Sequence, residues 1–394
     1  MKILFLLSRY PYPINKGDKL RAYHQINNLR NNNEVHLIAI NEELNQNKYE
    51  HNLETIADFV TILKLSKLQK IWNLFRSIFS KFPFQTEYFY TKKNKMIIDS
   101  IVERYKPDII ICQLIRMGKY LESIDSVPKV IDYIDVLSKG LELRKSRVSF
   151  LLKPIFDSEY KRVLEYEEKV NSKFDGSIII TENDKNALPI NNKSGVMVVP
   201  NGIETDYFQP DPELKKDIDL LFVGNMSYKP NIDAVVYFIE SIFPLVKQKH
   251  PNCKFHIVGS SPSLRIKRLV NKSVIVSGWV DDIRPFYNRA KIFVAPMQIG
   301  TGLQNKILEA MSMSIPAVIS SHAAKGIEGC SANTVFIEDS PMEFANRILE
   351  LIENPILREK MGKESRQFVK KHYSWENIVG DFEKYLNKIA NRVE

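Results

Sequence analysis

Cysteine is scarce in this 394-residue chain: Cys112, Cys253 and Cys330 lie far apart and fit no C-x-x-C or zinc-ribbon spacing. This scarcity argues against a disulfide framework and favours a reducing compartment, so we expect a cytoplasmic protein. Long hydrophobic runs are also missing, because no stretch approaches the roughly 20 apolar residues that cross a bilayer. The apolar run after Lys2 is too short for a signal peptide, and no small-residue cleavage site follows it, so it predicts a buried first strand.

Several motifs of common enzyme classes are absent as well. The chain has no G-x-S-x-G, H-E-x-x-H or Walker motif, which removes the serine hydrolase, zinc protease and P-loop classes. The Gly-Thr-Gly sequence at 300–302 lacks the third glycine of a dinucleotide fingerprint, so an oxidoreductase is not expected. The histidines form no metal-ligand spacing, and the Asp-Ile-Asp sequence at 217–219 leads directly into an apolar run and is better explained as the start of a strand. We therefore expect no metal and no other cofactor.

The net charge of +9 is unevenly distributed. Residues 1–200 carry 31 Lys and Arg against 24 Asp and Glu. This excess indicates an anionic partner such as a membrane surface or a lipid-phosphate acceptor, or it simply keeps the protein in solution. No nucleic-acid-binding module is present, so no nucleic-acid partner is expected.

Residues 60–82 combine apolar side chains at helical spacing with a basic remainder, and no acid lies between Asp58 and Glu87. The apolar positions are Leu65, Leu68, Trp72, Phe75, Phe79 and Phe82, and the basic ones are Lys64, Lys67, Lys70, Arg76 and Lys81. This pattern predicts a basic amphipathic helix that contacts an anionic membrane. A helix that packs on its own sheet with a basic outer face fits the pattern equally well.

Short apolar runs alternate with helical-length segments through both halves of the chain, which predicts two doubly wound α/β domains with parallel sheets. The predicted strands are 2–8, 34–40, 108–114, 129–134, 176–181, 195–200, 219–224, 254–259, 273–278, 291–296, 316–320 and 334–338. We expect a first domain at 1–200, a second at 201–375, and a C-terminal helix at 376–394 that packs back on the first. The Pro-Asn-Gly turn at 200–202 is the expected hinge.

Residues 291–320 carry the strongest chemical signal. A predicted strand is followed by a loop with Gly300 and Gly302, and a helix is expected to start near Gln304. Glycines let a backbone approach a phosphate, and a helix N-terminus presents free N–H groups to an anion. Lys306 and Glu309 share one face of this helix, which would place a cation near a diphosphate and a carboxylate one turn deeper. The alternative for this pair is a plain ion pair on a surface helix, although Lys before Glu is the poorer order.

The segment GLQNKILEAMSMSIPAV at 302–318 resembles the signature of family-four glycosyltransferases of the GT-B fold. The resemblance implies two Rossmann-like domains facing across a cleft, and it places the ribose-binding glutamate of the family on Glu309. The donor-sugar glutamate of the family falls on Thr301, or on Ile299, and neither residue is acidic. Ser314 also replaces a common glycine. These departures resemble bacterial polysaccharide sugar transferases associated with exosortase systems.

The resemblance extends to other donor-binding positions of the second half. Lys229 matches a lysine that binds the donor diphosphate, while Asn225 stands where the family has an arginine. The segment at 277–296 resembles the part of the family that borders the nucleobase pocket, where Trp279 and Val280 are expected to hydrogen-bond the base through their backbone. The remaining donor-site positions that we expect from the match are Gly300, Thr301, Gly302, Leu303 and Lys306.

In the first half, Gly17 matches the family glycine where the backbone approaches donor phosphate and acceptor, and Arg21 and Lys19 are expected to add positive charge there. Many relatives place a histidine after a later strand, but here the stretch offers Asp132 and Asp135. Asp135 is expected to hold a donor hydroxyl or orient the acceptor nucleophile, or else to cap a helix.

Taken with the residues, the resemblance implies a retaining, metal-independent glycosyltransferase. It would move a sugar from a nucleotide-diphosphate sugar to a glycan or lipid-linked acceptor in polysaccharide biosynthesis. The catalytic candidates are Lys229, Glu309 and Asp135. The alternative is a GT-B relative that binds a nucleotide sugar or glycan without transferring it. The expected location is the cytoplasm, with peripheral contact at the inner face of the cell membrane through residues 60–82.

Overall fold

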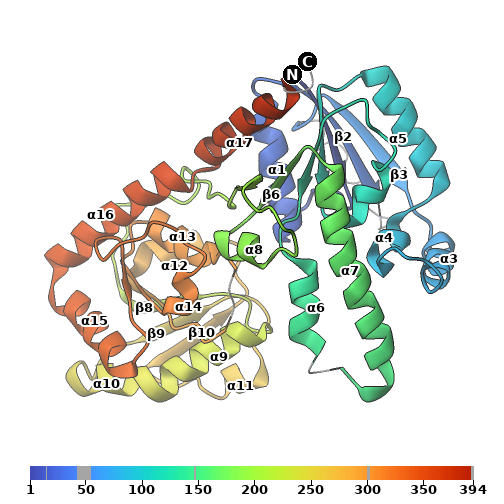
Figure 1. The fold of residues 1–394 in the computed structure, drawn as a ribbon. Helices are drawn as coiled ribbons and strands as arrows, with labels where there is room; N and C mark the ends of the chain where they lie inside the picture. Colours follow the sequence, from blue (N-terminus) through green and yellow to red (C-terminus); the bar gives the residue numbers. More distant parts are fainter. Residues whose placement is uncertain (15, 42–54, 146–147, 300–301, 392–394) are drawn as a thin grey trace. The chain divides into compact units, whose positions relative to one another are not determined.

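The computed structural model describes residues 1–14, 16–41, 55–145, 148–299 and 302–391. The chain forms two compact units, Met1–Pro200 with Ile378–Glu394, and Asn201–Asn377. Each unit is a parallel sheet with helices packed along it (Figure 1). Among the described residues, no helix combines the length and the hydropathy needed to cross a bilayer.

The first unit contains a seven-stranded sheet in the order β3-β2-β1-β4-β5-β6-β7, and every neighbouring pair is parallel. Its strands are β1 Lys2–Leu7, β2 Glu34–Asn41, β3 Phe59–Lys64, β4 Ile109–Gln113, β5 Lys129–Asp132, β6 Gly176–Ile179 and β7 Val196–Val198. Its helices are α1 Gly17–Leu29, α3 Lys67–Ser77, α4 Phe84–Phe89, α5 Lys92–Tyr105, α6 Leu137–Lys145, α7 Lys153–Lys173 and α8 Glu182–Ala187, with 3-10 turns η2 Ile115–Tyr120 and η3 Phe150–Leu152.

The second unit contains a six-stranded parallel sheet in the order β10-β9-β8-β11-β12-β13. Its strands are β8 Ile218–Val223, β9 Phe255–Val258, β10 Val274–Gly278, β11 Ala290–Ala295, β12 Ala317–Ile319 and β13 Val335–Ile337. Its helices are α9 Lys229–Tyr237, α10 Phe243–Lys249, α11 Leu264–Lys267, α12 Arg284–Arg289, α13 Asn305–Ser312, α14 Ser321–Ala324, α15 Pro341–Glu353 and α16 Pro355–His372, and a π-helical turn, Phe238–Ile242, joins α9 to α10.

The predicted strands are all present, with small differences at their ends, because their continuous apolar runs are buried on both faces of parallel sheets. The two sheets have separate apolar cores, one around Leu4, Ile38 and Ile110, the other around Phe222, Phe293 and Leu308. The predicted α/β fold class is therefore confirmed.

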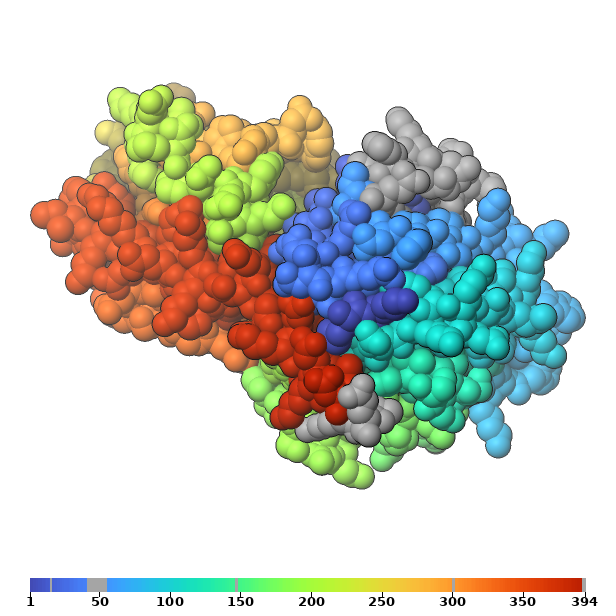
Figure 2. Space-filling view, turned by 90° about the horizontal axis from the view of Figure 1, so that it is seen from above, coloured from blue at the N-terminus to red at the C-terminus, as the bar shows by residue number. Residues whose placement is uncertain are grey.

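Helix α17, Trp375–Ala390, begins in the second unit and continues into the first. In the first unit Glu383 accepts a hydrogen bond from Asn33 at 2.6 Å, and Tyr385 Oη lies 3.1 Å from the backbone N of Ser177. Figure 2 shows this helix, in red, alongside the blue N-terminal segments. A carbon added at Gly176 would lie 2.3 Å from Ile389 Cδ1 and 2.8 Å from Tyr385 Oη, so α17 approaches β6 closely at this glycine.

The prediction of one helix over residues 60–82 is wrong. Residues Phe59–Lys64 form β3, which pairs with β2, and the helix α3 begins only at Lys67. The β-branched residues of 59–64 suit an edge strand, and Ser66 then caps α3 in a capping box with Gln69.

Candidate nucleotide-binding site

In the second unit the strand order reverses between β8 and β11, which lie side by side in the sheet. In open parallel sheets, ligands bind beyond the carboxyl ends of the strands at such a reversal. The loop Gly224–Tyr228 follows β8, and the segment that leads to α13 follows β11. The residues predicted from the sequence for donor binding are concentrated in these two connections.

Lys306 lies in the first turn of α13 and turns toward the end of β8. Its Nζ donates to Asn231 Oδ1 at 2.6 Å and lies 4.6 Å from the centroid of the Phe222 ring. Asn231, which is buried on α9, donates in turn to the backbone oxygen of Asn225 at 2.9 Å. Burial lowers the pKa of Lys306 to about 8, although the charge of Glu309 opposes this effect. The network Lys306–Asn231–Asn225 thus joins the connections after β8 and β11, and it holds a cation beside both.

Glu309 lies one turn further along α13 and is held by a buried tyrosine. Tyr287 Oη, on α12, donates to Glu309 Oε2 at 2.8 Å and lies 3.3 Å from the backbone oxygen of Lys306. Burial raises the pKa of Glu309, while the hydrogen bond from Tyr287 and the charge of Lys306 lower it. Lys306 and Glu309 both lie in the described part of the chain, and they form no ion pair with each other there. The two side chains therefore have separate supports, and the simple surface ion pair is excluded.

Two glycines bring the ends of β8 and β9 into direct contact. Gly259 has a φ of +144°, and a carbon added to it would lie 1.9 Å from the backbone oxygen of Gly224. A carbon added to Gly224 would lie 2.8 Å from Asn231 Nδ2. A side chain at Gly224 would press on the Asn231 amide, and one at Gly259 would press on the Gly224 backbone, so both glycines are part of how the site is built.

Lys229 and Asn225 do not extend the Lys306 network with their side chains. Lys229 is 67% exposed and pairs with Asp233 at 2.6 Å, and Arg265 approaches the same carboxylate at 3.7 Å. Asn225 is exposed, and its Oδ1 accepts hydrogen bonds from the backbone N and Oγ of Ser227. Its side chain thus closes a turn, while its backbone oxygen anchors Asn231. An exposed pair such as Lys229–Asp233 is worth at most about 1 kcal/mol, so an anion can compete for the lysine.

The other predicted donor-site residues differ in how they lie. Trp279 is 67% exposed after the edge strand β10, and Val280 packs partly against the core. Gly302 is exposed, and Leu303 is half-buried. A carbon added to Gly326 would lie 2.8 Å from Leu303 Cα, so the segment before α13 passes directly over that glycine. Gly300 and Thr301 lie outside the described residues.

In the first unit Gly17 begins α1, is exposed, and has open space where a side chain would project. Asp135 lies at the surface just after β5. Partial loss of surrounding water and the charge of Asp184 raise the pKa of Asp135, while Arg116 opposes them.

The expectation that Arg21 adds positive charge for a ligand near Gly17 is wrong, because the side chain is buried. Its guanidinium is fully buried and donates to Asp132 Oδ2 at 2.6 Å and to the backbone oxygen of Val199 at 2.7 Å. Asp132 is equally buried and also accepts from the backbone N of Ile134. The pair connects α1, β5 and the segment after β7, and it is structural.

Asn231 and Tyr287 are the site residues that sequence reasoning missed. Asn231 lies two positions after Lys229, but nothing in the spacing indicates that its amide reaches α13. Tyr287 precedes β11 in a segment that already matched the family resemblance, so that match was the available signal. In the described ranges no group of three or more His, Cys, Asp or Glu side chains is arranged to hold a metal ion.

Solved structures with the same architecture cover nearly the whole chain. TarM superimposes with a TM-score of 0.69 over 98% of this chain and 99% of its own, at 14% identity. Anabaena HepE, solved in complex with UDP, superimposes with a TM-score of 0.67 over 98% of this chain and 100% of its own, also at 14% identity. The chain therefore has the GT-B fold.

Sequence comparison matches part of the second unit to a known family. Residues 217–354, which hold the Lys306 network and Glu309, match the model of the family Glycosyl transferases group 1. A 44.6 kDa protein in the cps region of Klebsiella pneumoniae is 22% identical over 96% of this chain and 97% of its own length. The capsular polysaccharide biosynthesis glycosyltransferase CapM of Staphylococcus aureus is 26% identical over 48% of this chain and 54% of its own.

Proposed function

We propose that this protein is a retaining glycosyltransferase that takes a sugar from a nucleotide-diphosphate donor and adds it to a glycan or lipid-linked acceptor in cell-surface polysaccharide synthesis. One observation carries the proposal: α13 presents a lysine and a glutamate, each held by a hydrogen bond, at the strand-order reversal of the matched segment. Lys306 donates to Asn231, and Glu309 accepts from Tyr287. Similarity to CapM and to a protein in a cps region supports the polysaccharide context.

The donor diphosphate would lie at the N-terminus of α13, where backbone N–H groups and the Lys306 ammonium offset its charge. Glu309, one turn deeper, would accept hydrogen bonds from the ribose hydroxyls. HepE structures that contain UDP and UDP-glucose support a nucleotide-sugar donor for this fold. Lys229 would leave Asp233 to contact the same diphosphate.

In the transfer step, an acceptor oxygen forms a bond to the anomeric carbon as the bond from that carbon to the diphosphate breaks. Attack from the face of the departing diphosphate retains the anomeric configuration, and a diphosphate oxygen takes the acceptor proton. Asp135 would position a donor hydroxyl or the acceptor. The positive groups on α9 and α13 would neutralise the leaving group without a metal ion. We place this activity in the cytoplasm at the inner face of the cell membrane.

The test combines nucleotide binding with transfer. A thermal-shift screen against UDP, GDP, ADP, CMP and TDP sugars should show stabilisation by one donor class, because a ligand that binds only the native state raises its melting temperature. Lys306→Ala should then slow transfer, because it should raise the activation free energy by roughly 2–4 kcal/mol. The matched control is Glu353→Gln, because Glu353 is an exposed residue of the same unit that pairs only with His250 in the described part of the chain. It should change neither the thermal shift nor the transfer rate.

Binding with no transfer or donor hydrolysis under any condition would instead favour the non-catalytic alternative. Asn225 at the arginine position, with its side chain engaged in a turn, is the observation behind that second candidate. No stabilisation by any nucleotide sugar would contradict the transferase and would leave only the glycan-binding form of the alternative.

A further inference from the structure

Helix α3 is amphipathic in an inverted sense: the side chains that it buries are polar, and its large apolar side chains are exposed. The buried residues of the helix are Asn73 and Ser77. The exposed large apolar residues of α3 and the turn after it are Leu68, Ile71, Trp72, Leu74, Phe75, Ile78 and Phe79, with exposed fractions from 52% to 82%. A helix stabilised only by packing on its own sheet buries its apolar stripe, so this outward stripe needs another explanation.

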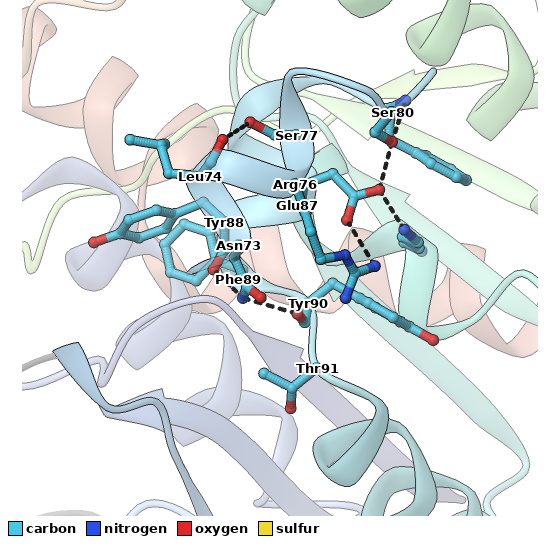
Figure 3. A network of polar contacts seen from close by, with 12 residues as sticks. Asn73, Leu74, Arg76, Ser77, Ser80, Glu87, Tyr88, Phe89, Tyr90 and Thr91 are labelled. Atoms are coloured by element: carbon cyan, nitrogen blue, oxygen red, sulfur yellow. Dashed lines mark hydrogen bonds and ion pairs between the residues drawn. The ribbon is translucent and has the colours of Figure 1, made fainter. Parts of the chain in front are cut away.

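Polar contacts hold α3 in this orientation, as Figure 3 shows. Asn73 Nδ2 donates to the backbone oxygens of Tyr88 and Tyr90 at 3.1 and 2.9 Å. Arg76 lies 4.0 Å from the buried carboxylate of Glu87, which also accepts from Ser80 and Lys119 at 2.6 Å each. Because buried hydrogen bonds of this kind are costly to break, the outward direction of the aromatic rings is fixed by the fold.

A second exposed apolar segment lies at the start of α7. Phe150 and Leu151 in η3 are 86% and 83% exposed, and Leu152 and Ile155 are 56% and 55% exposed. Ile155 shares a face of α7 with Glu159 and Arg162, since the three are spaced i, i+4 and i+7.

That face of α7 is the one that meets the end of α3. Arg162 donates to the backbone oxygens of Ser77 and Ile78 at 2.7 and 3.2 Å, and Glu159 accepts from the backbone N of Phe84. The rise of a helix places Ile155 only about 10 Å along α7 from Arg162. The two apolar segments therefore flank one side of the first unit.

The charges in the sequence around α3 are positive. No acidic residue lies between Asp58 and Glu87, a stretch that carries Lys64, Lys67, Lys70, Arg76 and Lys81. The rings of Trp72, Phe75 and Phe79, with Arg76, Ser80 and Glu87, line a hollow of about 350 Å³. At the other segment Arg144 and Lys153 are exposed, while the nearby acids Glu142 and Asp157 are each paired with a lysine. Aromatic and aliphatic side chains bordered by lysines suit the interface of a bilayer that contains anionic lipid.

We infer that α3 with Ile78 and Phe79, together with Phe150–Ile155, forms a single docking surface for an anionic lipid bilayer. This surface would hold the first unit against the membrane, with the apolar side chains among the acyl chains and the lysines at the lipid phosphates. The inference deepens the peripheral membrane contact of the proposed function, and it requires neither a nucleotide donor nor sugar transfer.

The experiment is sedimentation of the full-length protein with phosphatidylcholine vesicles, with and without about 30% phosphatidylglycerol. The wild type should sediment with the anionic vesicles and lose binding in high salt. Phe75→Glu with Phe79→Glu, and separately Phe150→Glu with Leu151→Glu, should each lower the partition coefficient by at least about tenfold. Lys67→Glu with Lys81→Glu should lower it on anionic vesicles only. All six positions are exposed, so the variants should fold.

Ile356→Glu is the matched control, because Ile356 is 82% exposed on α16 of the second unit and should not affect vesicle binding. Nucleotide thermal shifts, measured on the same samples, should be the same in all variants. Failure of the wild type to sediment, or undiminished binding of the α3 variant, would overturn the inference while the nucleotide result stands. A wild-type dimer that the α3 substitutions dissociate, with vesicle binding unchanged, would assign the surface to a second copy of the chain and also overturn it.

Discussion

The charge of Lys306 is the residue-scale property on which donor binding depends. A diphosphate attracts the protonated amine, and burial brings the pKa of Lys306 down to about 8 in the free protein. The lysine is therefore mostly charged at neutral pH and mostly neutral one to two units above its pKa. Binding of an anion favours the charged form, so it must raise this pKa, and the affinity must fall as the pH rises through it.

We accordingly expect the nucleotide dissociation constant to be nearly flat below about pH 8 and to rise by up to about tenfold per pH unit above it. Lys306→Arg keeps the charge at every accessible pH, because guanidinium titrates above about 12. Its dissociation constant should stay flat to about pH 9.5. Isothermal titration calorimetry across this range measures both profiles, and an equally steep rise in the Lys306→Arg variant would contradict the assignment.

Tyr287 is expected to act through Glu309. Removal of its hydroxyl in Tyr287→Phe leaves the half-buried Glu309 carboxyl without its 2.8 Å donor, which should raise the pKa of Glu309 further and loosen the carboxylate. A nucleoside diphosphate should bind about tenfold more weakly, while its 2′,3′-dideoxy analogue should bind as before, because only the ribose hydroxyls need Glu309. Tyr373→Phe, a buried tyrosine bonded to the backbone of Glu328, is the control. Equal losses for both ligands would indicate a general packing defect.

At the scale of elements, the sequence predicts the strands well and the placement of α3 poorly. A buried parallel strand is a local property, since its apolar run is the same whichever neighbours it has. The apolar spacing of residues 68–79 also predicts a helix correctly, but that spacing is identical whether the stripe faces the core or the solvent. The orientation is decided by Asn73 and Glu87, whose partners come from other elements. The contacts of Asn231 and Tyr287 with α13 escape prediction for the same reason.

Glu87 is expected to be the main attachment of α3. Burial alone would raise its pKa, but hydrogen bonds from Lys119 and Ser80 and the charges of Lys119 and Arg76 hold the pKa below its ordinary value. Its contribution to stability is therefore present at neutral pH and is lost as the pH falls through that lowered value. Glu87→Gln should destabilise the first unit by about 3 kcal/mol, because Lys119 keeps a buried charge without its counterion, and it should loosen α3, because Arg76 loses its charge partner.

Trypsin should then cleave Glu87→Gln faster after Lys67 and Lys70, the lysines of α3. The matched control is Glu142→Gln, since Glu142 forms only an exposed pair with Lys139. Unchanged cleavage in Glu87→Gln, measured by mass spectrometry of early fragments, would show that other contacts hold α3.

At the scale of the whole molecule, the separate cores of the two units imply that the chain does not unfold in a single step. The core around Leu4 and Ile110 and the core around Phe222 and Leu308 are distinct clusters, and the candidate nucleotide site lies entirely on the second. A nucleotide at 100 times its dissociation constant stabilises the unit that binds it by about 2.7 kcal/mol. For domains of this size, that corresponds to roughly 5–10 °C in melting temperature.

Calorimetry should therefore show two unfolding transitions. Nucleotide should raise the melting temperature of one and leave that of the other unchanged. Arg21→Ala identifies the transition of the first unit. Loss of the guanidinium leaves the buried Asp132 carboxylate of that unit without its partner, at a cost of about 3–5 kcal/mol. The transition that Arg21→Ala lowers must be the one that nucleotide does not raise. If nucleotide and Arg21→Ala shift the same transition, either the nucleotide binds the first unit or the two cores melt together. In both cases the assignment of donor binding to the α13 site alone would be wrong.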